Sequence, residues 1–213
     1  SQVAEMTRMQ DEVITGIANL IESRDGSTGL HVKNTQNYVQ ILTKALREKG
    51  MYPDILDHNY ELNTVKASVL HDIGKIKTPD AILLKPGRLT DEEFEVMKQH
   101  TVAGCEIIDR IIGNVEHEEY VDIARKIARY HHERWDGTGY PDGLSGEEIP
   151  LCARIMALAD VFDALYQDRC YKKAIRPASK VFEIIKENSG SQFDPNLTEI
   201  FLELQREITD ISE

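Results

Sequence analysis

The segment Leu70-His71-Asp72-Ile73-Gly74-Lys75 brings a histidine, an aspartate and a lysine close together in the chain. On a helix, Lys75 follows His71 by four residues and Asp72 by three, so the three side chains would face one pocket. Residues 65–70 are mostly apolar, which predicts that this segment is buried. A buried carboxylate needs a compensating partner, because an unpaired charge in a low-dielectric interior is very costly. A divalent cation is one such partner, and histidine beside aspartate suits a hard or borderline metal.

Taken alone, this pair is equally well explained by a core histidine beside a solvated aspartate, but further candidate ligands recur along the chain. Asp160 is the most informative of them, because it lies in the apolar segment 155–162, where a carboxylate has no polar surface to reach. By contrast, His58 and His117 lie among polar residues and are predicted to be exposed side chains outside the site. The complete candidate set of metal ligands consists of His31, His71, Asp72, His100, His131, His132 and Asp160.

Five imidazoles and two carboxylates exceed the needs of one metal ion and favour two cations that share a bridging ligand. Asp72 is the natural bridge, because a carboxylate offers two oxygens. The mixed nitrogen and oxygen donors favour Fe, Mn, Zn or Co over Mg or Ca. Two such ions catalyse phosphodiester hydrolysis, and Lys75 would then contact the scissile phosphate or protonate the leaving alkoxide. Arg169 and Lys172 could hold phosphates or could form only a solvated face.

The composition is that of a soluble globular protein. Of the 213 residues, 41% are hydrophobic and 29% are charged. No apolar run approaches the roughly 20 residues of a membrane span, and the polar start Ser1-Gln2-Val3 is not a secretory signal. The net charge of −12 disfavours binding to nucleic acid polymers, which need a basic surface. The cysteines lack metal-binding spacing and fit buried thiols in a reducing cytoplasm: Cys105, Cys152 and Cys170.

Hydrophobic periodicity predicts an all-α fold, because apolar residues recur at helical spacing and no run alternates for long as a strand would. Helices are expected at residues 4–23, 31–49, 62–74, 90–112, 116–130, 151–166, 177–188 and 195–208. The segment 1–23 is either a core helix or the tail of a linker from an upstream domain, and residues 24–213 form the main domain. Since the chain does not begin with Met, we expect it to be a fragment of a longer protein.

The block His131-His132-Glu133-Arg134-Trp135-Asp136-Gly137-Thr138-Gly139-Tyr140-Pro141 is more specific than any spacing argument. Together with the His71–Lys75 segment and with residues 159–165, it makes the chain resemble the HD-GYP family. These proteins are bacterial cyclic diguanylate phosphodiesterases within the HD metallohydrolases. The similarity extends from Arg24 to Pro195. It implies an all-helical HD-domain bundle of about seven or more helices and a non-haem metal centre of iron or manganese.

The resemblance also implies roles for individual residues. It assigns the seven candidate ligands named above to the metals, Asp72 and Lys75 to catalysis, and residues 139–141 to a loop beside the pocket. Residues expected to contact the substrate are Asp25, Lys75, Tyr140, Arg169 and Lys172. Members with three metals carry a glutamate four residues before the first ligand histidine, where this chain has Ser27. We therefore expect two divalent ions, with a third site disfavoured.

The implied activity is hydrolysis of cyclic di-GMP to the linear dinucleotide pGpG, and the step onward to GMP stays open. Alternatives are hydrolysis of the mixed 3′,3′-cyclic GMP-AMP ring, and a receptor or docking module with little catalysis. A third is an HD hydrolase acting on nucleotide monoesters or triphosphates. The expected setting is the bacterial cytoplasm, with an upstream sensory or receiver domain and diguanylate cyclase domains as partners. The helix at 4–23 could also pair with its twin in a homodimer.

Overall fold

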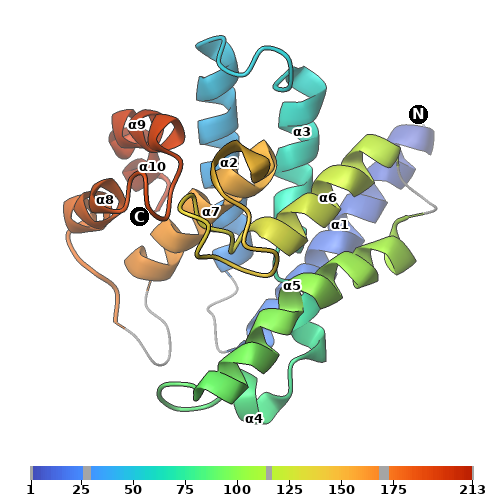
Figure 1. Cartoon of the computed structure of the whole chain (residues 1–213). Helices are drawn as coiled ribbons and strands as arrows, with labels where there is room; N and C mark the ends of the chain where they lie inside the picture. Colours follow the sequence, from blue (N-terminus) through green and yellow to red (C-terminus); the bar gives the residue numbers. More distant parts are fainter. Residues whose placement is uncertain (1, 26–29, 114–116, 168–172, 213) are drawn as a thin grey trace.

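The computed structural model describes residues 2–25, 30–113, 117–167 and 173–212, and its regular elements are helices (Figure 1). Within these ranges there is no strand beyond one isolated bridge between Ser189 and Phe193, so the all-α prediction is confirmed. The α-helices are α1 (Gln2–Glu22), α2 (His31–Glu48), α3 (His58–Ala67), α4 (Asp80–Leu83), α5 (Asp91–Ile111), α6 (Glu118–Tyr130), α7 (Leu151–Tyr166), α8 (Ala178–Glu187), α9 (Pro195–Glu203) and α10 (Gln205–Asp210). None of the described helices combines the length and apolar character needed to cross a membrane.

Helix α7 forms the centre of the core. Its residues 151–159 are all buried, as the almost continuous apolar sequence predicts. It packs against α2 and α6 on one side and against α8 and α9 on the other, as Figure 1 shows. Phe162 lies between Tyr38 of α2 and Phe182 of α8, with ring centroids 5.1 and 4.9 Å away. This central position fixes Asp160, six residues before the end of α7, against the helices that carry the histidines.

Helix α1 contributes to the same core. Ile14, Ala18 and Ile21 are buried, and the helix packs against α2 and against the segment around His71. The predicted helix at 4–23 is therefore present, and its C-terminal half is packed as a core helix would be. The division of the chain into residues 1–23 and 24–213 remains a prediction.

The prediction of one continuous helix over 62–74 is wrong. Helix α3 ends at Ala67, and the chain continues as two 3₁₀ turns, Ser68–Leu70 and Ile73–Lys77. Asp72 lies between them with φ −104° and ψ 12°, outside the α region. The physical reason is close packing against α5: a Cβ added at Gly74 would lie 1.8 Å from the carbonyl oxygen of His100.

Two smaller elements also differ from prediction. The segment predicted as a loop around Pro79 contains the short helix α4, and the helix predicted at 195–208 is divided at Leu204 into α9 and α10. Leu204 has φ −89° and ψ 11°, which ends one helix and starts the next at an angle. The predicted capping box at the start of α5 is present, because Thr90 accepts the Glu93 N–H and the Glu93 carboxylate accepts the Thr90 N–H.

Candidate metal centre

The seven predicted metal ligands come from five parts of the fold and meet at one place. His31 is the first residue of α2, and His100 lies in the middle of α5. The turns after α3 supply His71 and Asp72, the end of α6 supplies His131 and His132, and α7 supplies Asp160. The sequence separation between these residues is large, so only the packing of α2, α5, α6 and α7 around the His71–Lys75 segment brings them together.

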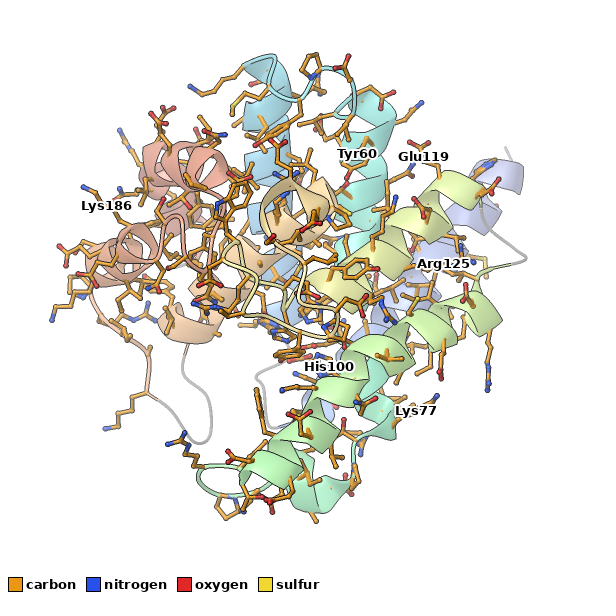
Figure 2. The ribbon with its side chains drawn as sticks, in the orientation of Figure 1. Tyr60, Lys77, His100, Glu119, Arg125 and Lys186 are labelled. Atoms are coloured by element: carbon orange, nitrogen blue, oxygen red, sulfur yellow. The ribbon has the colours of Figure 1, made fainter. Side chains whose placement is uncertain are left out.

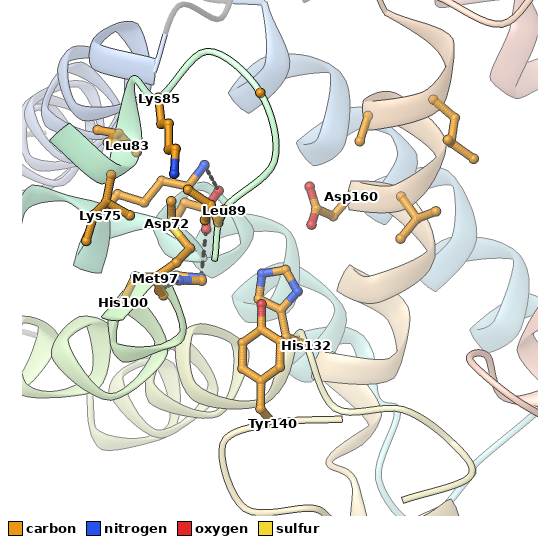
Figure 3. A pocket seen from close by; sticks show the side chains of 15 residues that line it. Asp72, Lys75, Leu83, Lys85, Leu89, Met97, His100, His132, Tyr140 and Asp160 are labelled. Atoms are coloured by element: carbon orange, nitrogen blue, oxygen red, sulfur yellow. Dashed lines mark hydrogen bonds and ion pairs between the residues drawn. The ribbon is translucent and has the colours of Figure 1, made fainter. Parts of the chain in front are cut away.

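Asp72 lies at the centre of the cluster. Its Oδ1 is 3.3 Å from His100 Nε2 (Figure 3). The same Oδ1 is 3.5 Å from His131 Nε2, and Oδ2 is 3.4 Å from His71 Nε2. The potential ligand atoms form two groups, and within each group all atoms lie within 4.8 Å of one another. One consists of Asp72, His100, His131 and His132, and the other of His31, His71 and Asp72. Asp72 is the member that both groups share, as expected for a bridging carboxylate.

The backbone fixes the orientation of three of the rings. Each Nδ1 lies within hydrogen-bond distance of a carbonyl about one helical turn earlier: His71 to Ser68 at 2.9 Å, His100 to Met97 at 2.7 Å and His131 to Ile127 at 3.0 Å. A carbonyl only accepts, so Nδ1 carries the proton and donates it. In the neutral imidazole, Nε2 then presents its lone pair to the centre of the cluster.

These Nε2 atoms fit a metal ion and little else. Within the described part of the chain, the Nε2 atoms of His31, His71, His100 and His131 and the Oδ1 atom of Asp72 are buried without a hydrogen-bond partner. A lone pair of a neutral imidazole 3.3–3.5 Å from a carboxylate oxygen is repelled, unless a cation lies between the two. Buried polar atoms are nearly always satisfied in folded proteins. The donor set therefore has the chemistry of a divalent metal site.

Burial and neighbouring charge keep Asp72 and the two histidines that follow α6 in the protonation states that a metal needs. Burial, together with repulsion from the charge of protonated His131 and His100, holds the pKa of His132 well below its usual range, and burial also lowers the pKa of His131. Burial alone would raise the pKa of Asp72, but Lys75 and His71 hold it well below its usual value. The imidazoles of α6 are thus neutral and Asp72 is ionised near neutral pH.

His31 depends on a residue that sequence reasoning did not find. Its Nδ1 donates to Asp163 Oδ2 at 2.6 Å, and its Nε2 lies 3.4 Å from Asp160 Oδ1. Burial lowers the pKa of His31, but the nearby carboxylates of Asp160 and Asp163 and the charge of Glu22 outweigh burial and raise it to about 10. The only sequence signal for Asp163 was its position one turn after Asp160 in the same apolar helix.

Glu22 is a second residue that the sequence did not indicate. It is the last residue of α1 and is only 1% exposed. Its Oε1 lies 4.0 Å from His31 Nε2 and 3.8 Å from Lys75 Nζ. Ser27 stands where three-metal members carry a glutamate, whereas here the carboxylate of Glu22 reaches this end of the site from an earlier position in the chain.

Lys75 lies at the edge of the cluster. Its Nζ is 2.7 Å from Asp72 Oδ2, and its side chain is 12% exposed. Arg24, just after α1, donates to the carbonyl of Lys75 at 3.3 Å and to Asp80 Oδ1 at 2.6 Å. Lys75 and Asp72 thus face the same cavity, as predicted, although the segment is not a regular helix, and His71 is not among the residues that line this cavity.

A cavity of about 430 Å³ opens from the cluster (Figure 3). The polar side of the cavity is formed by Asp72, Lys75, His100, His132 and Asp160. The remaining wall is mostly apolar and comes from α4, α5, the loop between them and α7. This wall includes Leu83, Leu89, Met97, Val161, Ala164 and Leu165. A cavity of this kind, apolar with a few converging polar groups, is typical of a small-molecule site.

Tyr140 closes one end of the cavity. Its ring stacks on His132, with centroids 4.9 Å apart and planes inclined by 21°, and it meets Phe94 edge to face at 5.8 Å. The loop that carries Tyr140 is held by Glu133, which accepts the backbone N–H groups of residues 142–144. Trp135, the other aromatic residue of this loop, lies over Arg154 instead.

Some predicted residues cannot be placed. The described residues do not include Ser27, Arg169, Lys172, Cys170 or the side chain of Asp25. His58 and His117 are exposed, as predicted.

Comparison with known proteins identifies the family of the chain. Residues 17–197 match the family model of the HD domain, and the chain belongs to the HD domain family. The resemblance to the HD-GYP branch of this family is also confirmed. A relative in Vibrio cholerae serotype O1 named "Cyclic di-GMP phosphodiesterase" is 44% identical over 98% of this chain. Another from the same organism, "3′3′-cGAMP-specific phosphodiesterase 2", is 35% identical over 94% of it.

The chain spans 42% and 36% of the length of these two relatives. Among solved structures, an HDG"Y"P protein from Bdellovibrio bacteriovorus superimposes with a TM-score of 0.60 over 98% of this chain and 64% of its own. Its sequence is 17% identical, so this likeness supports the HD fold.

Proposed function

We propose that this chain is a metal-dependent phosphodiesterase that hydrolyses cyclic di-GMP to the linear dinucleotide pGpG. The observation that carries the proposal is the position of Asp72, which is shared by two groups of buried ligand atoms. One cation would be held by His31, His71, Asp72 and Asp160, and the other by Asp72 with the histidines of α5 and α6. These donors suit Fe, Mn, Zn or Co, and the resemblance to the HD-GYP family favours iron or manganese. Such a pair supplies Lewis acidity and a nucleophile at neutral pH.

The protein's own residues would orient and polarise the substrate. The Lys75 ammonium, 2.7 Å from Asp72 Oδ2 at the mouth of the cluster, would bind a non-bridging oxygen of the scissile phosphate or give its proton to the leaving oxygen. Asp72 acts with it by holding this ammonium in place. The apolar wall and Tyr140 would exclude water and contact a nucleobase. Asp25, Arg169 and Lys172 remain proposed substrate contacts on sequence grounds.

The preference for the diguanylate ring is supported by the higher identity to the relative named for it, 44% against 35% for the relative named for cyclic GMP-AMP. The same proposal places the protein in bacterial cytoplasmic signalling. It also includes an upstream sensory or receiver domain, diguanylate cyclase partners and a homodimer. The proposal further includes two bound metal ions per chain and a reaction that stops at pGpG.

The test is a hydrolysis assay with protein purified without oxygen and loaded with Fe(II) or Mn(II). We expect cyclic di-GMP to be converted to pGpG, as resolved by anion-exchange chromatography. His71→Ala should abolish turnover, whereas His58→Ala, at an exposed histidine of α3, should leave it unchanged. Tight binding of cyclic di-GMP without turnover in the metal-loaded protein would contradict the proposal and favour a receptor.

A further inference from the structure

Lys85 is a second lysine on the wall of the cavity. It lies in the loop between α4 and α5 and lines the same cavity as Lys75 and Asp72. Figure 3 shows Lys75 and Lys85 on one side of the cavity, across from Asp160. The Lys85 side chain is 30% exposed, so its ammonium is neither buried in the core nor free in bulk solvent. The mechanism proposed above gives this residue no role.

Helix α5 holds this ammonium in position. Lys85 Nζ donates to Glu93 Oε2 at 2.5 Å, and the same carboxylate oxygen accepts the Thr90 N–H at 2.8 Å as part of the capping box. Glu93 is therefore fixed by the helix terminus, and it fixes Lys85 in turn. An ammonium has three N–H donors, and the described structure records one hydrogen bond from Lys85.

A cyclic dinucleotide would bring a second negative charge to this cavity. Its ring contains two phosphodiesters, each with one negative charge, and only one of them can be at the metal centre. The other would meet a wall formed by Leu83, Leu89 and Met97 in a protein of net charge −12. An anion against such a wall is costly unless a cation pairs with it. Among the described residues that line the cavity, Lys75 and Lys85 are the lysines, and Lys75 is engaged by Asp72.

We propose that Lys85 binds the phosphate of the cyclic dinucleotide that is not cleaved. This inference rests on the proposed function and deepens it. Lys85 is thereby a substrate-binding residue that favours a ring with two phosphates over a simple phosphodiester. Glu93 acts as its positioning residue.

The test compares two substrates that differ in the number of phosphates. Lys85→Met keeps the apolar stem and removes the charge. We expect it to raise the KM for cyclic di-GMP about 10-fold or more, with kcat within about 2-fold, because one charge-assisted hydrogen bond is lost. The kcat/KM for bis(4-nitrophenyl) phosphate, which has a single phosphodiester, should change by less than about 2-fold. Lys85→Arg, which keeps the charge, should restore most of the affinity for cyclic di-GMP.

Lys77→Met is the matched control. Lys77 forms an equivalent pair with Glu106, with Nζ and Oε2 2.7 Å apart, but it lies on the outer surface away from the cavity (Figure 2). This variant should leave both substrates unaffected. An equal loss on both substrates in Lys85→Met would show an effect on the metal centre or the fold and overturn the proposal, as would an unchanged KM for cyclic di-GMP.

Failure of the proposed function would be recognised separately. If the metal-loaded wild-type protein cleaves bis(4-nitrophenyl) phosphate but not cyclic di-GMP, the proposed activity is wrong. The Lys85 proposal is then decided by calorimetry with cyclic di-GMP. A Kd weakened about 10-fold in Lys85→Met supports it, and a Kd equal to that of the wild type, or no binding by the wild type, overturns it.

Discussion

His31 Nδ1 and Asp163 Oδ2 lie 2.6 Å apart, and both side chains are almost completely buried. The second carboxylate oxygen of Asp163 accepts a hydrogen bond from Asn34 at 3.1 Å, so the acid is anchored on both sides. This arrangement turns the His31 ring so that Nε2 faces Asp160 and the cluster around Asp72. Asp163, which contributes no ligand atom of its own, thus determines the position of His31 Nε2.

We predict that Asp163→Asn weakens metal binding about 10- to 100-fold, because loss of the outer carboxylate disturbs the orientation and basicity of the ligand. The affinity can be measured by competition with a chelator of known strength. Asp122→Asn is the control, since Asp122 is a solvent-accessible residue of α6 that pairs with Lys126. Equal affinities in Asp163→Asn and the wild type would show that Asp163 does not support His31.

Metal binding should strengthen with rising pH. In the metal-free protein the pKa of His31 is raised to about 10, so near neutral pH a proton occupies the nitrogen that a metal would take. That proton stabilises the metal-free fold fully below the unfolded pKa of about 6.5, and this contribution is lost as pH rises through the folded pKa. A metal must displace the proton.

We therefore expect the affinity for Mn(II) to rise about 10-fold per pH unit between about pH 7 and pH 8.5. The increase in Tm that Mn(II) produces should grow over the same range. Differential scanning calorimetry of metal-free and Mn(II)-loaded protein measures this difference. A metal-induced Tm increase that stays constant or shrinks with pH would contradict the protonation state assigned to His31.

Glu22 tests the number of ions. Because its Oε1 lies 3.8 Å from Lys75 Nζ and 4.0 Å from His31 Nε2, we predict that it positions these two side chains. Glu22→Gln should then keep two bound ions per chain, as measured by mass spectrometry of the metals, and should lower kcat about 10-fold or more through a displaced Lys75. Three ions in the wild type and two in Glu22→Gln would instead make Glu22 a ligand.

The residues that meet in the cluster were predictable from the sequence, whereas the residues that support them were not. His71, Asp72 and Asp160 stand out because polar side chains are unusual in apolar segments. Asp163 and Glu22 look like ordinary helical acids, and Asp163 lies 132 residues from the histidine that it orients. Contacts over that distance depend on how α2 and α7 pack, and no local pattern records this.

The path of the backbone around Gly74 could not be predicted from the local sequence, for a similar reason. Periodicity favours a helix through Gly74, but the chain there follows the surface of α5 at contact distance. The division between α9 and α10 at Leu204 likewise follows from packing on the core, which α9 reaches through Leu197 and Phe201 and α10 through Ile208. Capping signals, by contrast, are local, and the start of α5 at Thr90 was predicted correctly.

Gly74 gives a stability prediction from this contact. A Cβ at Gly74 would lie 1.8 Å from the His100 carbonyl oxygen and 2.6 Å from the Gly104 nitrogen, so Gly74→Ala should destabilise the fold by about 3 kcal/mol or more. Gly16→Ala is the matched control, since nothing lies within 4 Å of its added Cβ in α1. It should be neutral or stabilising by about 0.5–1 kcal/mol. Denaturant unfolding measures both, and equal stabilities would show that the tight contact is absent.

The most direct test of the account is the rate of cyclic di-GMP hydrolysis measured as Mn(II) is added stepwise to metal-free protein, with bound metal per chain determined at each point. If both ligand groups around Asp72 are needed, the rate stays close to zero up to about one ion per chain and rises as the second ion binds. Full activity with a single ion per chain, or turnover that persists in metal-free protein, would contradict a shared Asp72 as the centre of the reaction.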